Sequence, residues 1–259
     1  MHTDGQGAPR SVSEVQIHPP PRYRERRSRT VAGATVWART IGSADDAPVL
    51  PDGCMDLLWL RGRLVVAGPD TCGYPTTAPP GTRVTGIRFF PGTAPALFGV
   101  PARELLDRRA DLDELWRPAR VRPLAEILAA STDPMTELDR IAGDVAAETD
   151  PADPALRVVV RRLGAGSSVA AVAESLGLGE RRLHRMSLSA FGYGPKMLGR
   201  VLRLQRALAL ARRGVPFAET AFRAGYADQA HLARDVRELA GTSLARLIAR
   251  DRSVQMSGA

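Results

Sequence analysis

Two stretches in the last hundred residues carry side chains that could contact the edges of nucleic-acid bases. The candidate contact residues are Arg181, His184 and Arg185 in the first stretch, and Gln229, Ala230, Ala233 and Arg234 in the second. Arginine pairs with guanine and glutamine with adenine in the major groove of DNA. Each stretch taken alone is equally consistent with an ordinary solvated helix face. Their repetition favours double-stranded DNA as the partner.

A second group of reactive side chains lies earlier in the chain, at Asp52, Cys54 and Asp56. In an extended segment all three would point the same way. Cys54 could then be a nucleophile, a redox sensor or a ligand contact, or it could be a small buried residue. Trp59 is either a core residue or part of an effector platform.

Arg88 completes this candidate effector site, because it lies in an otherwise apolar segment and needs a partner if it is buried. Asp56 or Asp70 could supply that partner, and an anionic effector is the alternative. The sequence does not name a ligand, but it predicts that a small-molecule effector would bind here.

Catalysis is disfavoured, because no histidine lies between His18 and His184 to pair with a cysteine or to bind a metal. Neither Cys54 nor Cys72 belongs to a zinc-binding cluster, and a disulfide between the two remains open. We therefore expect no enzyme, no metal and no cofactor. The alternative is a DNA-repair enzyme that transfers alkyl groups to Cys54 or Cys72.

The elements that must position the base-contacting residues follow one template twice, at residues 168–190 and 217–239. Ala173 precedes Gly177 by four residues, and Ala221 precedes Gly225 by four. Two helices that cross closely need a small residue at the contact, and the tight turn needs glycine. One long helix, expected at residues 195–213, joins the two copies. This is the pattern of two helix-turn-helix units.

Residues 168–250 resemble the AraC/XylS-type bacterial transcription regulators. The resemblance implies sequence-specific DNA binding and contact with RNA polymerase. Ser187 and Val236 stand where that family commonly has Phe, and Ser243-Leu244 where it often has Thr-Pro. The matching segments are VAAVA at 169–173, RRLHR at 181–185, GYGPK at 192–196, RLQRA at 203–207 and GYADQAHLARD at 225–235.

Residues 50–116 resemble the amino-terminal half of a subset of the same regulators, which implies a cupin-like sensing region. The matching segments are LPDGCMDLLW at 50–59, AGPDT at 67–71 and GIRFFPG at 86–92. The expected class is therefore α+β: a small antiparallel half-barrel or cupin-like domain with helices, followed by an all-α domain with two helix-turn-helix units.

We expect a disordered tail at residues 1–30, a regulatory domain at 31–150 and the DNA-binding domain at 151–259. Strands are expected at 31–40, 55–60, 63–67 and 83–90, with a tight turn at Arg61-Gly62. Helices are expected at 102–116, 124–130 and 135–147, then at 154–163, 168–175, 180–190, 195–213, 217–224, 228–239 and 242–250.

The charge distribution supports this division. Residues 151–259 carry 18 Lys and Arg against 8 Asp and Glu, a net charge of +10, whereas residues 31–150 carry 12 against 17, a net charge of −5. A basic module joined to an acidic one is typical of nucleic-acid-binding proteins. We expect no signal peptide and no membrane span. We expect a cytoplasmic monomer or homodimer.

Overall fold

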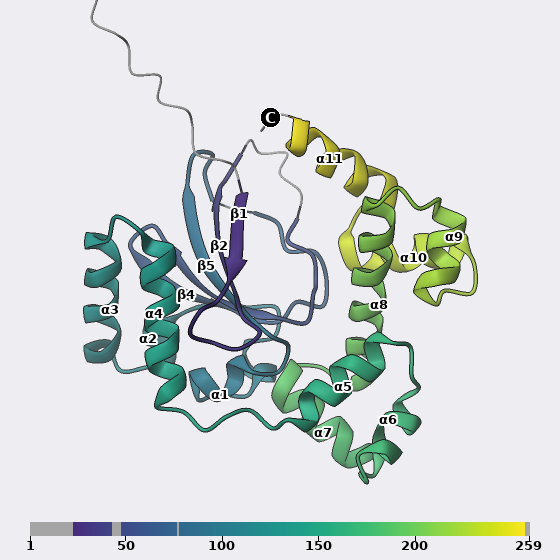
Figure 1. Ribbon diagram of the computed structural model, residues 1–259, viewed down its shortest axis with the longest axis horizontal. Helices are drawn as coiled ribbons and strands as arrows, with labels where there is room; N and C mark the ends of the chain where they lie inside the picture. Colours follow the sequence, from purple (N-terminus) through teal and green to yellow (C-terminus); the bar gives the residue numbers. More distant parts are fainter. Residues whose placement is uncertain (1–22, 43–47, 77, 257–259) are drawn as a thin grey trace, which may run out of the picture.

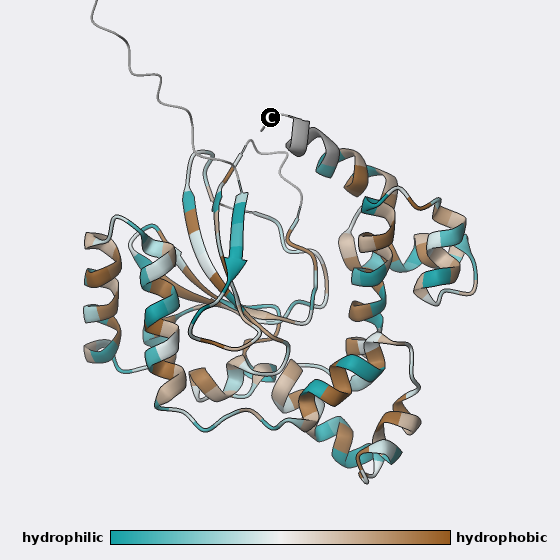
Figure 2. Cartoon of the chain, in the orientation of Figure 1, coloured by the Kyte–Doolittle hydropathy of each residue, from teal (hydrophilic) through white to brown (hydrophobic). Residues whose placement is uncertain are grey.

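The computed structural model describes residues 23–42, 48–76 and 78–256, with side chains through residue 251. The amino-terminal half is an antiparallel sheet with helices against one face, and the carboxy-terminal half is all helical (Figure 1). The class is α+β, as the sequence predicts. Figure 2 shows that hydrophobic and hydrophilic residues alternate along most of the carboxy-terminal helices, as expected for helices that each bury one side.

The sheet has six strands in the order β1-β2-β5-β3-β4-β6, and every neighbouring pair is antiparallel. The four expected strands are confirmed, although β2 begins at Thr35 rather than at residue 31. The β3–β4 turn is at Arg61 and Gly62, with φ of 51° and 78°, as a two-residue hairpin turn requires. The strands are β1 (Tyr23–Arg27), β2 (Thr35–Thr40), β3 (Met55–Leu60), β4 (Arg63–Ala67), β5 (Arg83–Phe89) and β6 (Arg109–Asp111).

The single helix expected at 102–116 is wrong. The segment forms the 3-10 helix η1 (Ala102–Leu105), strand β6 and the short helix α2 (Leu112–Leu115). Asp107 reverses the chain at a φ of 55°. Its carboxylate accepts hydrogen bonds from the backbone N and the hydroxyl of Thr71, both at 2.7 Å. The leucines of this segment therefore lie on separate elements, and their helix-like spacing arises because these elements contribute side chains to the same core.

The disordered tail expected at 1–30 is wrong for its last eight residues, and residues 1–22 lie outside the described part of the chain. Residues 23–27 form β1. The segment is held by the buried carboxylate of Asp139, which accepts from Arg26 Nη1 at 2.6 Å and from Ser28 Oγ at 2.5 Å. Composition could not indicate this order, because the partner lies on a distant helix.

The main core of the amino-terminal half lies between one face of the sheet and three helices, α1 (Ala94–Phe98), α3 (Pro118–Ala130) and α4 (Pro134–Ala147). Val36, Leu57 and Ile87 supply it from three neighbouring strands. Because side chains alternate along a strand, their neighbours Trp37, Asp56 and Arg88 face the opposite side. That opposite side carries the polar side chains relevant to function.

The carboxy-terminal half has two small cores, one at each end of the long helix α8 (Pro195–Arg212). The expected helices are confirmed within a few residues, except that the last runs to Met256. Gly199 lies inside α8, and Leu198, Val201, Leu204 and Leu208 bury its inner face. The other helices are α5 (Ala155–Gly164), α6 (Val169–Ser175), α7 (Glu180–Phe191), α9 (Phe217–Ala224), α10 (Gln229–Ala240) and α11 (Leu244–Met256).

Candidate functional site

The first helix-turn-helix unit consists of α6 and α7. Ser168 caps α6 by accepting a hydrogen bond from Ala171 N at 3.2 Å. Gly177 takes a φ of 63° in the turn, and Leu178 N then donates to Ala173 O at 2.9 Å. Ala173 is buried. Its size lets the two helices approach, as the template predicts.

The second unit, α9 and α10, repeats this construction. Gly225 has a φ of 86°, and Tyr226 N donates to Ala221 O at 2.9 Å, the same bond at the same place as in the first unit. Asp228 caps α10 by accepting from His231 N at 2.6 Å. The shared bond shows that the two units have one local structure, although α10 starts one residue later relative to its glycine.

On α7, the three predicted contact residues Arg181, His184 and Arg185 are all exposed, and Leu183 and Ser187 are buried beneath them. His184 lies at the flank of this surface. A Cβ added to Gly194 would lie 2.8 Å from His184 Nε2, so the imidazole packs against the following turn. Arg181 and Arg185 therefore form the centre of the outward face.

The outward face of α7 has a further arginine that the sequence analysis did not single out. Arg182 is exposed beside Arg181. Its position in the RRLHR segment was the available indication. We call Arg181, Arg182, His184 and Arg185 the α7 face.

On α10, Gln229, Ala230 and Arg234 are exposed, and Ala233 is half-buried. Arg237, which the sequence analysis also passed over, is exposed one turn further along the helix from Arg234. Helical spacing from Arg234 could have identified it. These five residues form the α10 face, with Arg234 and Arg237 as its cationic part.

The connector helix α8 holds the second recognition helix through a buried carboxylate. Asp235 of α10 is ion-paired with Arg200 and, at 3.7 Å, with Arg203, and it accepts a hydrogen bond from Tyr226 Oη at 2.9 Å. Arg200 also pairs with Glu238. Burial and the Asp235 carboxylate raise the pKa of Tyr226, so its hydroxyl remains a donor. This cluster fixes α10 against α8.

A further contact joins α8 to the first helix of the second unit. Arg206 Nη2 donates to Ala224 O, the last residue of α9, at 2.7 Å. A Cβ added to Gly166, beside the first unit, would lie 3.8 Å from the same Nη2 atom. Arg206 therefore ties α8 to α9 and lies near the turn that precedes the first unit.

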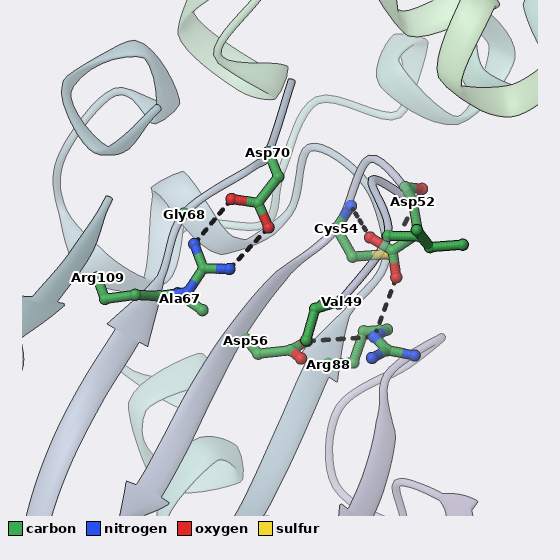
Figure 3. A pocket seen from close by; sticks show the side chains of 10 residues that line it. Val49, Asp52, Cys54, Asp56, Ala67, Gly68, Asp70, Arg88 and Arg109 are labelled. Atoms are coloured by element: carbon green, nitrogen blue, oxygen red, sulfur yellow. Dashed lines mark hydrogen bonds and ion pairs between the residues drawn. The ribbon is translucent and has the colours of Figure 1, made fainter. Parts of the chain in front are cut away.

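A small polar cavity of about 30 Å³ lies in the amino-terminal half, on the side of the sheet away from the main core (Figure 3). Four of the five predicted effector residues line it: Asp52, Cys54, Asp56 and Arg88. The first three meet at this cavity although their segment is bent and not extended, because Gly53 has a φ of 82°. The other lining residues are Val49, Leu50, Ala67, Gly68, Asp70 and Arg109.

Trp59 is the predicted effector residue that the structure places elsewhere. It packs against the main core with Leu57, on the opposite face of β3 from Asp56. The alternation of side chains along a strand explains this position, because Trp59 is three residues from Asp56. Trp59 is a core residue.

Two arginines neutralise most of the acidic cavity wall (Figure 3). Arg88 Nε lies 3.2 Å from Asp52 Oδ2 and 3.3 Å from Asp56 Oδ1, which confirms Asp56 as a partner. Asp70 pairs instead with Arg109, at 2.8 and 2.7 Å. Arg109 could not be assigned to this site from the sequence, because it lies on β6, where the spacing of the leucines predicts a helix.

Burial raises the pKa of three cavity groups, Asp56, Cys54 and Asp70. The pKa of Asp56 rises to about 6, mainly through burial, and Arg88 opposes this shift. Burial and then the Asp52 carboxylate raise the pKa of the Cys54 thiol well above its usual value. A protonated thiol is a poor nucleophile and a poor redox sensor. Cys54 and Cys72 are both free, so the structure contains no bridge between them.

The described part of the chain contains no group of three His, Cys, Asp or Glu side chains arranged to hold a metal ion. Within the same residues, no helix combines the length and the apolar character needed to cross a bilayer.

The segment that lines the cavity also contacts the DNA-binding half. Leu50 packs against the core of the second helix-turn-helix unit. Nε2 of Gln205 on α8 donates a hydrogen bond to Pro51 O at 2.6 Å. A Cβ on Gly53, whose φ is 82°, would lie 3.7 Å from Tyr193 Oη. We call residues 50–54 the junction loop.

The turn between α7 and α8 docks against the sheet domain at a second point. A Cβ on Gly192 would lie 2.7 Å from Pro69 Cγ and 3.2 Å from Leu106 Cδ1. Gly192 also has a φ of 82°, so both its conformation and its surroundings require glycine. The first recognition helix is therefore packed directly against the cavity-bearing domain.

Comparison with known families divides the chain in the same way. Residues 172–250 match the family described as "Helix-turn-helix domain", and residues 34–111 match "Domain of unknown function (DUF6597)". The first match includes the turn and second helix of the first unit and all of the second unit. No curated protein sequence matches the chain.

Among solved structures, the chain is similar to the carboxy-terminal domain of AraT, a response regulator from Geobacillus stearothermophilus. That match has 22% identity over 38% of this chain and 86% of the other, with a TM-score of 0.35. A probable AraC family transcriptional regulator from Rhodopseudomonas palustris is 23% identical over 38% of this chain and 97% of the other, with a TM-score of 0.33. An apo ToxT variant from Vibrio cholerae is 11% identical over 86% and 99%, with a TM-score of 0.48.

Proposed function

We propose that this DNA-binding transcription regulator, which joins an AraC-type helix-turn-helix domain to an amino-terminal domain of unknown function, inserts α7 and α10 into successive major grooves of one DNA site. The observation that carries the proposal is the duplicated unit on a single connector, with an exposed basic face on each second helix. The match of residues 172–250 to a helix-turn-helix domain supports a regulatory role for the chain.

The length of the connector supports simultaneous binding by both units. Helix α8 has 18 residues, which at 1.5 Å per residue is roughly 27 Å. Successive major grooves on one face of the duplex recur at about 34 Å. A modest bend of the DNA towards the protein would close the difference.

The α7 face and the α10 face differ in the DNA bases that they can contact. Arg181, Arg182 and Arg185 favour guanines or phosphates below α7, whereas Gln229 on α10 matches adenine. The +10 charge of residues 151–259 favours attachment to the phosphate backbone of either strand. Base contacts then supply specificity and phosphate contacts supply much of the affinity.

We propose in addition that a small-molecule effector modulates DNA binding from the amino-terminal half. The support is the polar cavity and the junction loop, which lines that cavity and contacts α8. The proposal includes RNA polymerase as a second partner. Only the family resemblance supports this part of it.

Genome-wide mapping of the tagged protein would supply cognate sites, and hydroxyl-radical footprinting of the full chain on one such site tests the proposal. We expect two clusters of protection about one helical turn apart, within roughly 17–20 base pairs per monomer. Arg185→Ala should weaken protection in one cluster and Arg234→Ala in the other. A single cluster that responds to Arg185→Ala alone would show that α10 does not read DNA.

A further inference from the structure

We propose that residues 69–73, which we call the strap, fix the relative position of the two recognition helices, so that the sheet domain determines which spacing of the two DNA contact regions the chain accepts. One end of the strap contacts the carboxy-terminal end of α7, and the other end contacts that of α10. The inference rests on the proposed binding of both helices to one DNA site. It goes beyond that function because it assigns spacing specificity to a segment outside the DNA-binding half.

The strap meets α7 at Pro69. Gly192 is the residue that ends α7, and a Cβ on it would lie 2.7 Å from Pro69 Cγ. Both residues are buried. Leu106, which follows η1 in the sheet domain, packs against the core of the first unit beside them. The end of α7 is therefore enclosed by side chains of the amino-terminal half.

The strap meets α10 at Gly73. A Cβ on this residue would lie 3.2 Å from the backbone oxygen of Ala240, the last residue of α10, and 3.3 Å from Pro48 Cβ. Both distances are shorter than ordinary van der Waals contact, so the absence of a side chain lets the strap reach the helix end. Because Pro69 and Gly73 are four residues apart, the two contact points on the strap lie at most about 14 Å from each other.

The strap is held firmly by the sheet domain. Pro69 O accepts a hydrogen bond from Asp107 N at 2.9 Å, and the Asp107 carboxylate accepts from the backbone N and the hydroxyl of Thr71. Asp70 is 7% exposed and accepts two hydrogen bonds from Arg109. Three successive residues of the strap are therefore fixed to β6 and to the turn before it, and the strap acts as a spacer between the two helix ends.

The connector α8 alone defines the arrangement of the two units less well. The two units have separate cores at its two ends, and Gly199 lies inside the helix. A Cβ on Gly199 would make only ordinary contacts, at 3.9 Å from Leu163 Cδ2, so packing does not require glycine there. Glycine is among the least helix-favouring residues, and its conformational freedom makes the helix easier to bend. A second attachment outside α8 therefore restricts bending that α8 by itself permits.

The strap leaves the base-contacting ends of both helices free. Recognition helices contact base edges with their amino-terminal residues. Arg181 and Gln229 lie in the first turns of α7 and α10 and are exposed, whereas the strap contacts the opposite ends of these helices. The strap can therefore stay in place while both helices occupy DNA.

The first measurement determines the distance between the helices in the full chain without DNA. Spin labels are attached at Ser189→Cys on α7 and Ala230→Cys on α10, which are both exposed positions. Cys72→Val removes the exposed native thiol and is the parent for this experiment. Pulsed electron paramagnetic resonance should give one narrow distance distribution in the parent. Gly73→Val should broaden or shift it, because the added side chain forces the strap away from Ala240.

The second measurement compares affinity for a cognate site with affinity for sites that carry one inserted base pair between the two protected clusters. The insertion lengthens the separation by about 3.4 Å and rotates one cluster by about 35° relative to the other. We expect the wild type to lose about tenfold or more in affinity, because the DNA must be deformed to restore the spacing. Gly73→Val should reduce this loss to about threefold or less. Cys72→Val, which places the same side chain at the neighbouring exposed position, is the matched control and should behave as the wild type does.

Pro69→Ala tests the α7 end of the strap without added bulk, and it decides the question if Gly73→Val fails to fold. It should broaden the label distances and weaken the spacing preference in the same direction. Label distances that stay unchanged in both variants would overturn the inference. Changed distances with an unchanged spacing preference would overturn the role of the strap in specificity.

The two measurements separate this inference from the proposed function. If the wild type protects two clusters and the label distances do not respond to the variants, only the strap is refuted. A single protected cluster in the wild type refutes the proposed binding by both helices instead. In that case the label distances, which are measured without DNA, still show whether the strap holds the two helices.

Discussion

Replacing Asp235 by alanine tests how the second recognition helix is held in place. The side chain is 4% exposed and is shared by Arg200, Arg203 and Tyr226. Alanine leaves the Tyr226 hydroxyl buried without a partner and two guanidinium groups without their shared carboxylate. Arg200 keeps its pair with Glu238.

The expected loss of stability can be worked from these contacts. An orphaned buried hydroxyl costs about 1–3 kcal/mol. Removing one partner of a buried ion pair costs about 3–5 kcal/mol when the remaining charge is fully buried. The side chains of Arg200 and Arg203 are 26% and 30% exposed, so water recovers part of that cost. We expect about 3 kcal/mol in total, which is large compared with the whole stability of a small domain.

Urea unfolding measures the stability change, and Glu219→Ala is the matched control in the same unit. Glu219 pairs with Arg223 at 3.1 Å, and both side chains are about half exposed, so its removal should cost less than about 1 kcal/mol. Footprinting supplies the functional readout: Asp235→Ala should lose the α10 cluster of protection and keep most of the α7 cluster. Equal stability losses in the two variants would refute the reasoning, and so would an unchanged α10 cluster.

Three further outcomes follow from the structure. Arg185→Ala and Arg234→Ala should each cost about 1–3 kcal/mol of binding at a cognate site and relax preference at one base position, measured by selection on randomised sites; equal losses on all sequences would indicate phosphate contacts. Affinity should fall steeply with salt in proportion to the number of phosphates contacted, and a salt-independent gel shift would contradict the charge argument. Stability should fall as pH rises from about 4 to 6 and then level off, because the folded state keeps a proton on Asp56, of pKa about 6, that the unfolded chain releases near its usual value. The charged groups facing Asp56 are Arg88, Asp52 and Arg109. Asp56→Asn should flatten this slope in pH-dependent urea titrations, and an unchanged slope would assign it to other carboxylates.

The sequence was informative where structure is decided locally. The two alanine–glycine pairs predict both turns, because a close helix crossing and a left-handed backbone each restrict the residue to one or two types. The hairpin at Arg61-Gly62 is predicted for the same reason. The outward faces of α7 and α10 follow from helical period once the buried leucines Leu183 and Leu232 are placed.

The sequence was misleading where distant contacts decide. Strand β1 is polar and reads as a tail, yet Asp139 of α4 holds the residues that follow it. Strand β6 has three residues, too few to show a period, and its leucine-rich flanks suggest a helix. Arg109 was therefore missed as a cavity residue. It has no local pattern that would indicate a site, because it comes to the cavity from a distant element.

The junction loop sets a limit on how strongly the cavity can influence DNA binding. It touches α8 through Gln205 and lies beside Tyr193, and α8 fixes the separation of the two recognition helices. A ligand can shift the arrangement of the two halves only by the difference between its affinities for the two arrangements. If that difference is one hydrogen bond to a cavity-lining residue, it is about 1.4 kcal/mol, or tenfold in DNA affinity. A larger effect would require the cavity to open further and the ligand to contact α8 directly.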